Sequence, residues 1–153
     1  MRELEVIGVR IEMPSNQPLV LLREVEGDRY LPIWIGAVEA SAIAFAQQGE
    51  STPRPLTHEL LQRVIEALGD ELTTVQIDDV ADGVFYATLV FTSGATVSAR
   101  PSDSIAVAIR MGTRIEASEA VLEEAGMHLP ADEDAEIEKF REFLEEIEPE
   151  DFA

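Results

Sequence analysis

Residues 31–46 read LPIWIGAVEASAIAFA, and within them a predicted strand passes directly into a predicted helix. The strand covers residues 30–35, where Pro32 favours a sheet edge or a bulge because proline cannot donate to a hydrogen-bonded ladder. The helix covers residues 37–48 and is apolar nearly all round, so we expect it to be buried. Its one charge is Glu39, in the first turn, where a carboxylate suits the helix dipole.

Two more strands precede this stretch and form a meander with it. Residues 3–13 alternate between apolar and polar side chains, with one slip at residues 7–8. Residues 19–25 form the second strand, and a tight turn at residues 26–28 leads into the strand at residues 30–35.

A second helix follows after a loop that contains two prolines. Thr57 is its expected N-cap, the helix runs to Leu68, and Gly69 ends it. Its apolar stripe consists of Leu60, Leu61, Val64, Ile65 and Leu68.

The second half of the chain adds a hairpin and two helices. Strands at residues 71–80 and 84–92 flank Asp82-Gly83, a strong hairpin signal, and a strand at residues 95–99 follows. The next helix opens at Pro101 or Ser102 and ends at Gly112. A short strand is expected at residues 114–117, and Ser118 caps the helix after it.

These elements predict an α+β fold, with mixed or antiparallel sheets packed against buried helices. We expect one domain over residues 1–130 and an acidic, helical C-terminal tail over residues 131–153. Apolar residues recur in the tail at helical spacing, namely Ile137, Phe140, Phe143, Leu144 and Ile147.

Length and composition favour a small cytoplasmic protein. The chain has 153 residues, which suits one domain, and it has no cysteine for a disulfide or a thiolate metal site. It opens without an apolar signal segment, and its most apolar run, residues 31–46, is shorter than the ~20 residues of a membrane helix. We therefore expect no membrane partner.

The net charge of −20 counts against binding of nucleic acid. Residues 1–116 carry 17 acids and nine arginines, whereas residues 117–153 carry 14 acids against Lys139 and Arg141. Phosphate binding normally depends on lysine and arginine, so a local arginine cluster or a bound divalent cation would have to offset this charge.

Three short segments place charge beside apolar sequence, and each lies at a helix start or in the loop before it. They are residues 36–40, 54–59 and 100–104. Helix starts can position carboxylates, and their unpaired N–H groups can bind phosphate. If the three converge, they form one pocket that contains Glu39, Arg54, His58, Glu59, Arg100, Ser102 and Asp103.

Each side chain in this pocket has a chemical role to offer. Carboxylates are the hard ligands that Mg²⁺ or Mn²⁺ prefers, so Glu39, Glu59 and Asp103 are the candidate metal ligands. A bound metal would activate water for phosphodiester hydrolysis. His58 is a candidate general acid or base. Substrate would be bound by Arg54, Arg100 and Ser102.

Structural interpretations stay open for the same residues. Glu39 can be a helix-dipole residue paired with Arg100 or Arg110, Ser102 and Asp103 can be capping residues, and His58 can satisfy a backbone carbonyl. Arg54 can pair with a nearby acid. The lone tryptophan, Trp34, is a core residue or an oligomer contact rather than a base-stacking platform.

The same segments resemble the bifunctional nuclease (DUF151) family in order and spacing over about residues 3–128. The matching stretches are LPIWIG at residues 31–36 with Glu39-Ala40 and Ala42-Ile43, Arg54-Pro55 with THELL at residues 57–61, Phe85-Tyr86-Ala87, and RPSDSIA at residues 100–106. Glu59 departs from the pattern, because the family more often has aspartate there. The UvrB/UvrC-like module of some relatives is missing.

The resemblance implies a metal-dependent nuclease that hydrolyses RNA or DNA, and catalytic residues Glu39, His58, Glu59 and Asp103. It also implies a homo-oligomer, since relatives of this size tend to form dimers or larger rings. The competing hypothesis is a non-catalytic oligomeric interaction or regulatory domain whose acidic tail contacts a basic protein partner. The net charge favours this second hypothesis.

Overall fold

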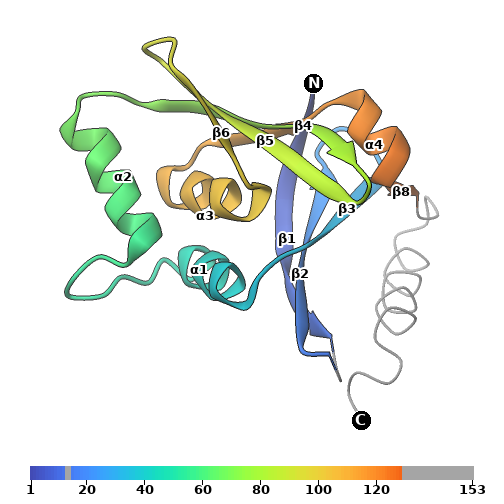
Figure 1. Ribbon diagram of the computed structural model, residues 1–153, viewed down its shortest axis with the longest axis horizontal. Helices are drawn as coiled ribbons and strands as arrows, with labels where there is room; N and C mark the ends of the chain where they lie inside the picture. The colour runs from blue at the N-terminus through green and yellow to red at the C-terminus, as the bar shows by residue number, and fades with distance from the viewer. Residues whose placement is uncertain (13–14, 129–153) are drawn as a thin grey trace.

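The computed structural model describes residues 1–12 and 15–128, which fold as one mixed sheet with four helices (Figure 1). The expected α+β class is confirmed. The expected tail helix at residues 131–153 lies outside the described residues.

Eight strands form the sheet in the order β6-β5-β4-β7-β1-β2-β3-β8. All neighbours run antiparallel except β4 and β7, which are parallel. The short strand β7 therefore joins the N-terminal meander to the later hairpin. The bounds are β1 (Arg2–Glu12), β2 (Gln17–Glu24), β3 (Arg29–Trp34), β4 (Leu72–Ala81), β5 (Val84–Phe91), β6 (Thr96–Ala99), β7 (Arg114–Ala117) and β8 (Met127–His128).

The meander has the irregularities that its sequence indicates. The register between β1 and β2 shifts between Val6 and Gly8, where the apolar alternation slips. Pro32 pairs with Leu21 of β2, whereas β8 pairs with β3 only at Arg29 and Tyr30. The missing N–H of Pro32 therefore costs no ladder bond, as expected for an edge position.

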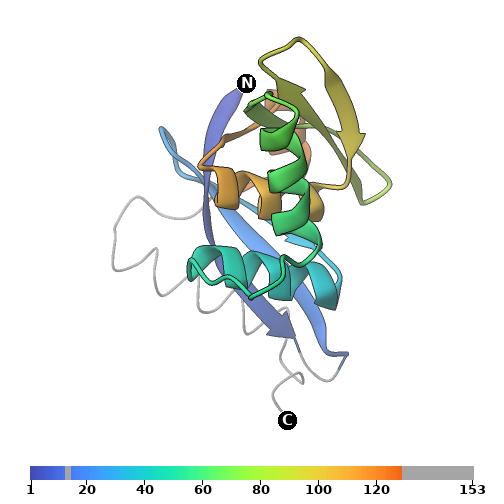
Figure 2. The ribbon, with the colours of Figure 1, turned by 90° about the vertical axis from the view of Figure 1, so that its left-hand side faces the viewer.

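Three helices stand together on one side of the sheet, and the fourth lies on the other side (Figures 1 and 2). The first three are α1 (Ala37–Gln47), α2 (Thr57–Ala67) and α3 (Pro101–Met111), and the fourth is α4 (Glu119–Ala125). Both α1 and α2 pack on α3, and α3 packs on β4 and β5. The buried middle of α3, residues 104–108, therefore lies at the centre of the core.

Neighbouring residues explain the β4–β5 turn and the start of α4, but not the start of α2. Asp82 and Gly83 both have positive φ, which the tight turn between β4 and β5 requires. Ser118 caps α4 by accepting a hydrogen bond from the N–H of Val121. The expected N-cap role of Thr57 is wrong, because Leu56 holds that position and no side chain caps α2.

The expected burial of the whole of α1 is wrong. Only Ala40, Ile43 and Ala46 of α1 are buried. In the apolar stripe of α2, only Ile65 is buried, and Leu68 is 79% exposed. The physical reason is that α2 packs chiefly on α3, which covers only part of its stripe.

A buried carboxylate ties the meander to α4. Glu24 is 2% exposed and binds Arg2 at 2.7 Å and Arg29 at 2.9 Å, and Arg29 also binds Glu119. The Arg29 guanidinium contributes most to lowering the pKa of Glu24 to about 2, with Arg2 adding to it against the opposing effect of burial. This ion cluster stabilises the fold in a region that the site residues below do not share.

No helix within residues 1–12 and 15–128 has the length and apolar character needed to span a membrane.

Candidate active site

The starts of α1, α2 and α3 meet, and they bring four of the expected side chains together. His58 Nε2 lies 2.8 Å from Asp103 Oδ1. Arg100 Nη2 lies 2.9 Å from Asp103 Oδ2 and 3.3 Å from Glu39 Oε2. We call Glu39, His58, Arg100 and Asp103 the Arg100 cluster. The expected pairing of Glu39 with Arg100 is thereby confirmed.

The start of α3 supplies two members of the cluster. Arg100 is the extended N-cap residue and Pro101 opens the helix, so Arg100 and Asp103 are three residues apart on the same side of the first turn. No side chain caps α3. The capping interpretation of Ser102 and Asp103 is therefore wrong, and the Asp103 carboxylate is instead shared between His58 and Arg100.

The other two members come from the starts of α1 and α2. Glu39 bends back over Gly36, where an added Cβ would overlap its Oε1 atom, so glycine leaves the room that this carboxylate needs. His58 lies in the first turn of α2 and is only 8% exposed.

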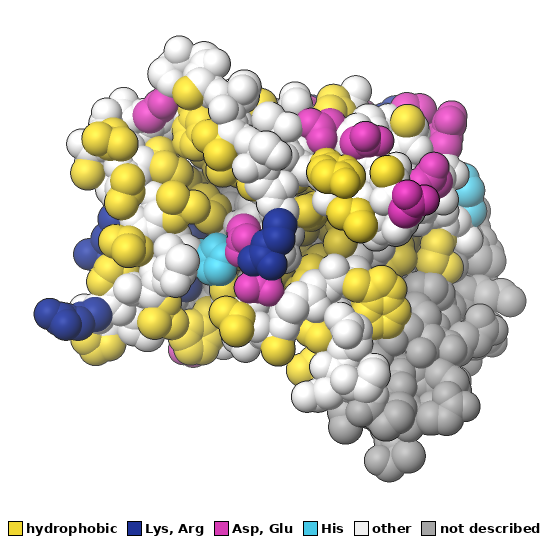
Figure 3. Space-filling model, in the orientation of Figure 1, with side chains coloured by type: hydrophobic (Ala, Val, Ile, Leu, Met, Phe, Trp, Pro, Cys, Tyr) yellow, Lys and Arg dark blue, Asp and Glu magenta, His cyan; other side chains and the backbone are white. Residues whose placement is uncertain are grey.

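Exposure increases from the acidic and imidazole groups to the guanidinium. The His58 and Glu39 side chains are 10% and 14% exposed, Asp103 is 33% exposed and Arg100 is 66% exposed. The Asp103 carboxylate, and after it Glu39, raises the pKa of Arg100 above its ordinary value, so this group stays charged. Figure 3 shows a histidine, an arginine and acidic side chains gathered on this face and ringed by hydrophobic side chains.

Three other expected site residues stand outside the cluster. Glu59 is buried and binds Arg63 of the next turn at 3.1 Å. Arg54 is exposed, and its guanidinium has no partner among the residues that the structure describes. Ser102 is 6% exposed, and within the described part of the chain its hydroxyl makes no hydrogen bond.

A hollow of about 360 Å³ adjoins the cluster between the end of β3, the β4–β5 turn and the start of α3. Arg100 and Ser102 line one part of it, and Trp34 and Phe85 line another. Trp34 is 52% exposed, so its expected place in the core of the chain is wrong.

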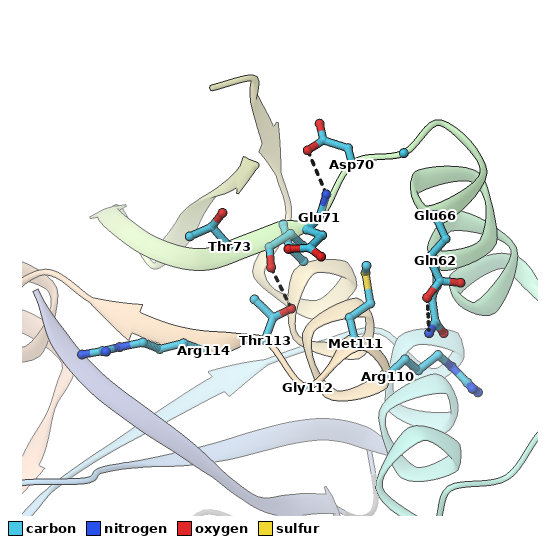
Figure 4. Close-up of a pocket in the computed structure, with 12 residues that line it drawn as sticks. Gln62, Glu66, Asp70, Glu71, Thr73, Arg110, Met111, Gly112, Thr113 and Arg114 are labelled. Carbon is cyan, nitrogen blue, oxygen red and sulfur yellow. Dashed lines mark hydrogen bonds between the residues drawn. The ribbon is translucent and has the colours of Figure 1, made fainter. Parts of the chain in front are cut away.

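A larger hollow, of about 790 Å³, lies between α2, α3, β4 and β7 (Figure 4). Its charged groups do not converge. The Arg110 and Arg114 side chains point to opposite sides in Figure 4, and Arg114 is bound to Glu116 at 3.0 Å. Since no expected site residue lines it, the Arg100 cluster is the stronger candidate for chemistry.

The acidic groups are not assembled as a three-ligand metal centre. In residues 1–12 and 15–128, no three or more His, Cys, Asp or Glu side chains are placed to hold one ion. Glu39 and Asp103 do converge on a single cation, the Arg100 guanidinium.

The sequence analysis missed two features, namely the aromatic wall of the smaller hollow and the pairing of Glu59 with Arg63. Phe85 lies on a hairpin whose turn is recognisable in the sequence, but nothing local places that hairpin beside α3. Arg63 could have been found, because it follows Glu59 at the i,i+4 spacing of a helical ion pair.

The gathered segments match a known domain. The sequence model of the bifunctional nuclease domain matches residues 20–130, which include the whole Arg100 cluster. The chain belongs to the bifunctional nuclease domain family. Two relatives from Mycobacterium tuberculosis are each 53% identical over 161 residues, which cover 99% of this chain and 98% of the relative. They are Uncharacterized protein MT1877 of strain CDC 1551 / Oshkosh and Uncharacterized protein Rv1829 of strain ATCC 25618 / H37Rv.

Proposed function

We propose that this bifunctional nuclease domain hydrolyses phosphodiester bonds in RNA or DNA at the Arg100 cluster. The observation that carries the proposal is the 2.8 Å contact between His58 and Asp103, made beside an exposed arginine. A carboxylate that binds one imidazole nitrogen fixes the ring and stabilises its protonated form, which is how a histidine serves as a general base.

Each group in the cluster has a distinct part in the reaction. Arg100 Nη1 has no partner within the described residues, so it can donate to a phosphate while Nε and Nη2 remain bound to Asp103. His58 accepts the proton of the attacking water through Nδ1, the water oxygen bonds to phosphorus, and the bond to the leaving oxygen breaks. The leaving oxygen then takes a proton from the imidazolium. Glu39 holds the guanidinium from the other side.

A Mg²⁺ or Mn²⁺ cofactor is part of the proposal, with Glu39 and Asp103 as its ligands. Mg²⁺ is commonly held by one or two carboxylates together with substrate phosphate oxygens and water, and these two carboxylates already share one cation. When bound, the metal would neutralise charge on the phosphate and lower the pKa of a bound water. Glu59 is paired with Arg63 and is not included among these ligands.

A cleavage assay tests the proposal. Labelled single-stranded RNA and DNA are incubated with the purified protein in Mg²⁺, Mn²⁺ or EDTA. We expect the wild type to cleave. Asp103→Asn and Glu39→Gln should each reduce the cleavage rate by about 100-fold or more, the usual range for loss of an acid–base or charge-stabilising group. Glu123→Gln, on the exposed surface of α4, is the matched control for loss of one negative charge. Cleavage that survives both site substitutions would show that the activity belongs to a contaminant.

A second candidate function, an oligomeric interaction domain, is favoured by the exposed stripe of α2. Leu60, Val64 and Leu68 are 51%, 44% and 79% exposed, although they are apolar and lie on one helix face. Apolar patches of this kind mark protein contacts in soluble proteins. Sedimentation of the wild type should show a dimer or larger species that Val64→Glu converts to a monomer. A monomeric wild type would remove this candidate.

A further inference from the structure

We propose that the hollow beside the Arg100 cluster holds one unpaired nucleobase, so that the enzyme acts on single-stranded nucleic acid. This proposal rests on the proposed nuclease function and names its substrate class. It starts from the position of the only tryptophan in the chain, Trp34, which lines the hollow and leaves half of its surface exposed.

The aromatic part of the hollow fits the face of a base. Trp34 ends β3, and Phe85 comes from β5, so two aromatic side chains from separate strands line the same small space. Bases stack on aromatic side chains regardless of sequence, and such stacking is the usual source of affinity for single strands.

The polar part of the hollow offers donors suited to a phosphate. Ser102 lines it, and although the residue is 94% buried, its hydroxyl makes no hydrogen bond to any described residue and so is available to a bound phosphate. The N–H groups of Ser102 and Asp103 lie in the first turn of α3 and have no acceptor within the helix. Arg100 adds its charge at the same edge. A base and its phosphate would thus meet complementary groups a short distance apart.

The size of the hollow favours a single-stranded substrate over a duplex. Its volume of about 360 Å³ is near the lower end of the range for small-ligand sites, roughly 300–1,000 Å³, which suits one nucleotide. A base inside a duplex is stacked on both faces and must leave the stack before it can enter such a site. Single strands avoid that cost.

Trp34 also reports on its own pocket, because its fluorescence comes from a single site. The full chain is titrated in EDTA with a single-stranded phosphorothioate oligonucleotide, the matching duplex, ribose 5-phosphate and inorganic phosphate. We expect a saturable change in Trp34 emission with the single strand, at least tenfold tighter binding than for the duplex, and much weaker binding of the two small phosphates. Equal affinity for the single strand and the duplex would overturn the proposal.

Substitution of Trp34 tests whether binding requires an aromatic ring for stacking or only an apolar side chain. Binding of a labelled single strand, followed by anisotropy, should weaken about tenfold in Trp34→Leu, which keeps an apolar side chain but removes the large ring. Tyr86→Ala is the matched control, because Tyr86 is an exposed aromatic residue of β5 outside the hollow. If Trp34→Leu binds as the wild type does and instead changes the sedimentation of the protein, Trp34 is an oligomer contact and the proposal fails.

The two proposals fail in different ways. Cleavage that is unaffected by Trp34→Leu and Ser102→Val leaves the nuclease function intact and refutes the nucleobase pocket. Binding of single strands that depends on Trp34, in a protein that cleaves nothing with any metal, supports the pocket and refutes hydrolysis at the Arg100 cluster.

Discussion

Replacing Glu24 with glutamine should destabilise the fold in a way that depends strongly on pH. The carboxylate is 2% exposed and holds both Arg2 and Arg29, so Glu24→Gln keeps the shape but removes the charge partner of Arg2 and one of the two charge partners of Arg29. Its pKa falls from 4.5 to about 2 in the folded chain. Since one pKa unit is worth about 1.4 kcal/mol, the ionised form contributes roughly 3 kcal/mol to stability.

The sign of the pH dependence follows from the direction of that shift. A carboxylate with a lowered folded-state pKa stabilises the protein above the unfolded pKa of 4.5, and the contribution is lost as the pH falls toward about 2. The difference in unfolding free energy between the wild type and Glu24→Gln should therefore be about 3 kcal/mol near neutral pH and should shrink steadily below pH 4.5.

Urea unfolding at a series of pH values, followed by circular dichroism, measures this difference. With a urea slope of roughly 1–3 kcal/mol per molar, the midpoint at neutral pH should fall by about 1–3 M. Glu119→Gln is the control, because Glu119 binds the same Arg29 but its side chain is 52% exposed, so its loss should lower the urea midpoint much less than loss of Glu24 does. A small difference for Glu24→Gln that stays constant with pH would refute the reasoning.

Three other substitutions have defined outcomes. In Gly36→Ala, the new Cβ would overlap Glu39 Oε1 and move this carboxylate, so cleavage should drop about tenfold or more with an unchanged circular dichroism spectrum; full activity would contradict this. Gly112→Ala places a side chain at φ 66° with no neighbour within 4 Å, so a backbone cost of about 1 kcal/mol should appear in urea unfolding, and an unchanged midpoint would count against it. Ser118→Ala removes the cap that accepts from Val121, and thermal unfolding should show a loss of about 1 kcal/mol, whereas Ser118→Asp should retain most of the stability.

Local patterns predicted most elements because their signals lie within a few residues. The slip at Val6 and Gly8, the Asp82-Gly83 turn and the cap at Ser118 all depend on neighbouring residues alone. The convergence of the three helix starts could be posed only as a condition, because charge beside an apolar helix does not by itself bring separate helices together.

Long-range placement could not be predicted in the same way. Nothing in the four residues of β7 shows that it pairs with β4 on one side and β1 on the other. The apolar stripe of α2 looks like a core face in the sequence, yet α2 packs chiefly on α3, and Leu68 stays exposed. Asp103 has the sequence context of a cap, and only the position of His58 decides that it binds an imidazole instead.

The proposed catalytic unit is tested most directly by a double-mutant cycle on cleavage of single-stranded RNA with His58→Ala, Asp103→Asn and the combined variant. If the 2.8 Å contact makes these residues one unit, each single substitution should cost about 100-fold or more, and the combined variant should be little slower than either. Losses that multiply in the combined variant, or single variants as fast as the wild type, would contradict the assignment of this pair to catalysis.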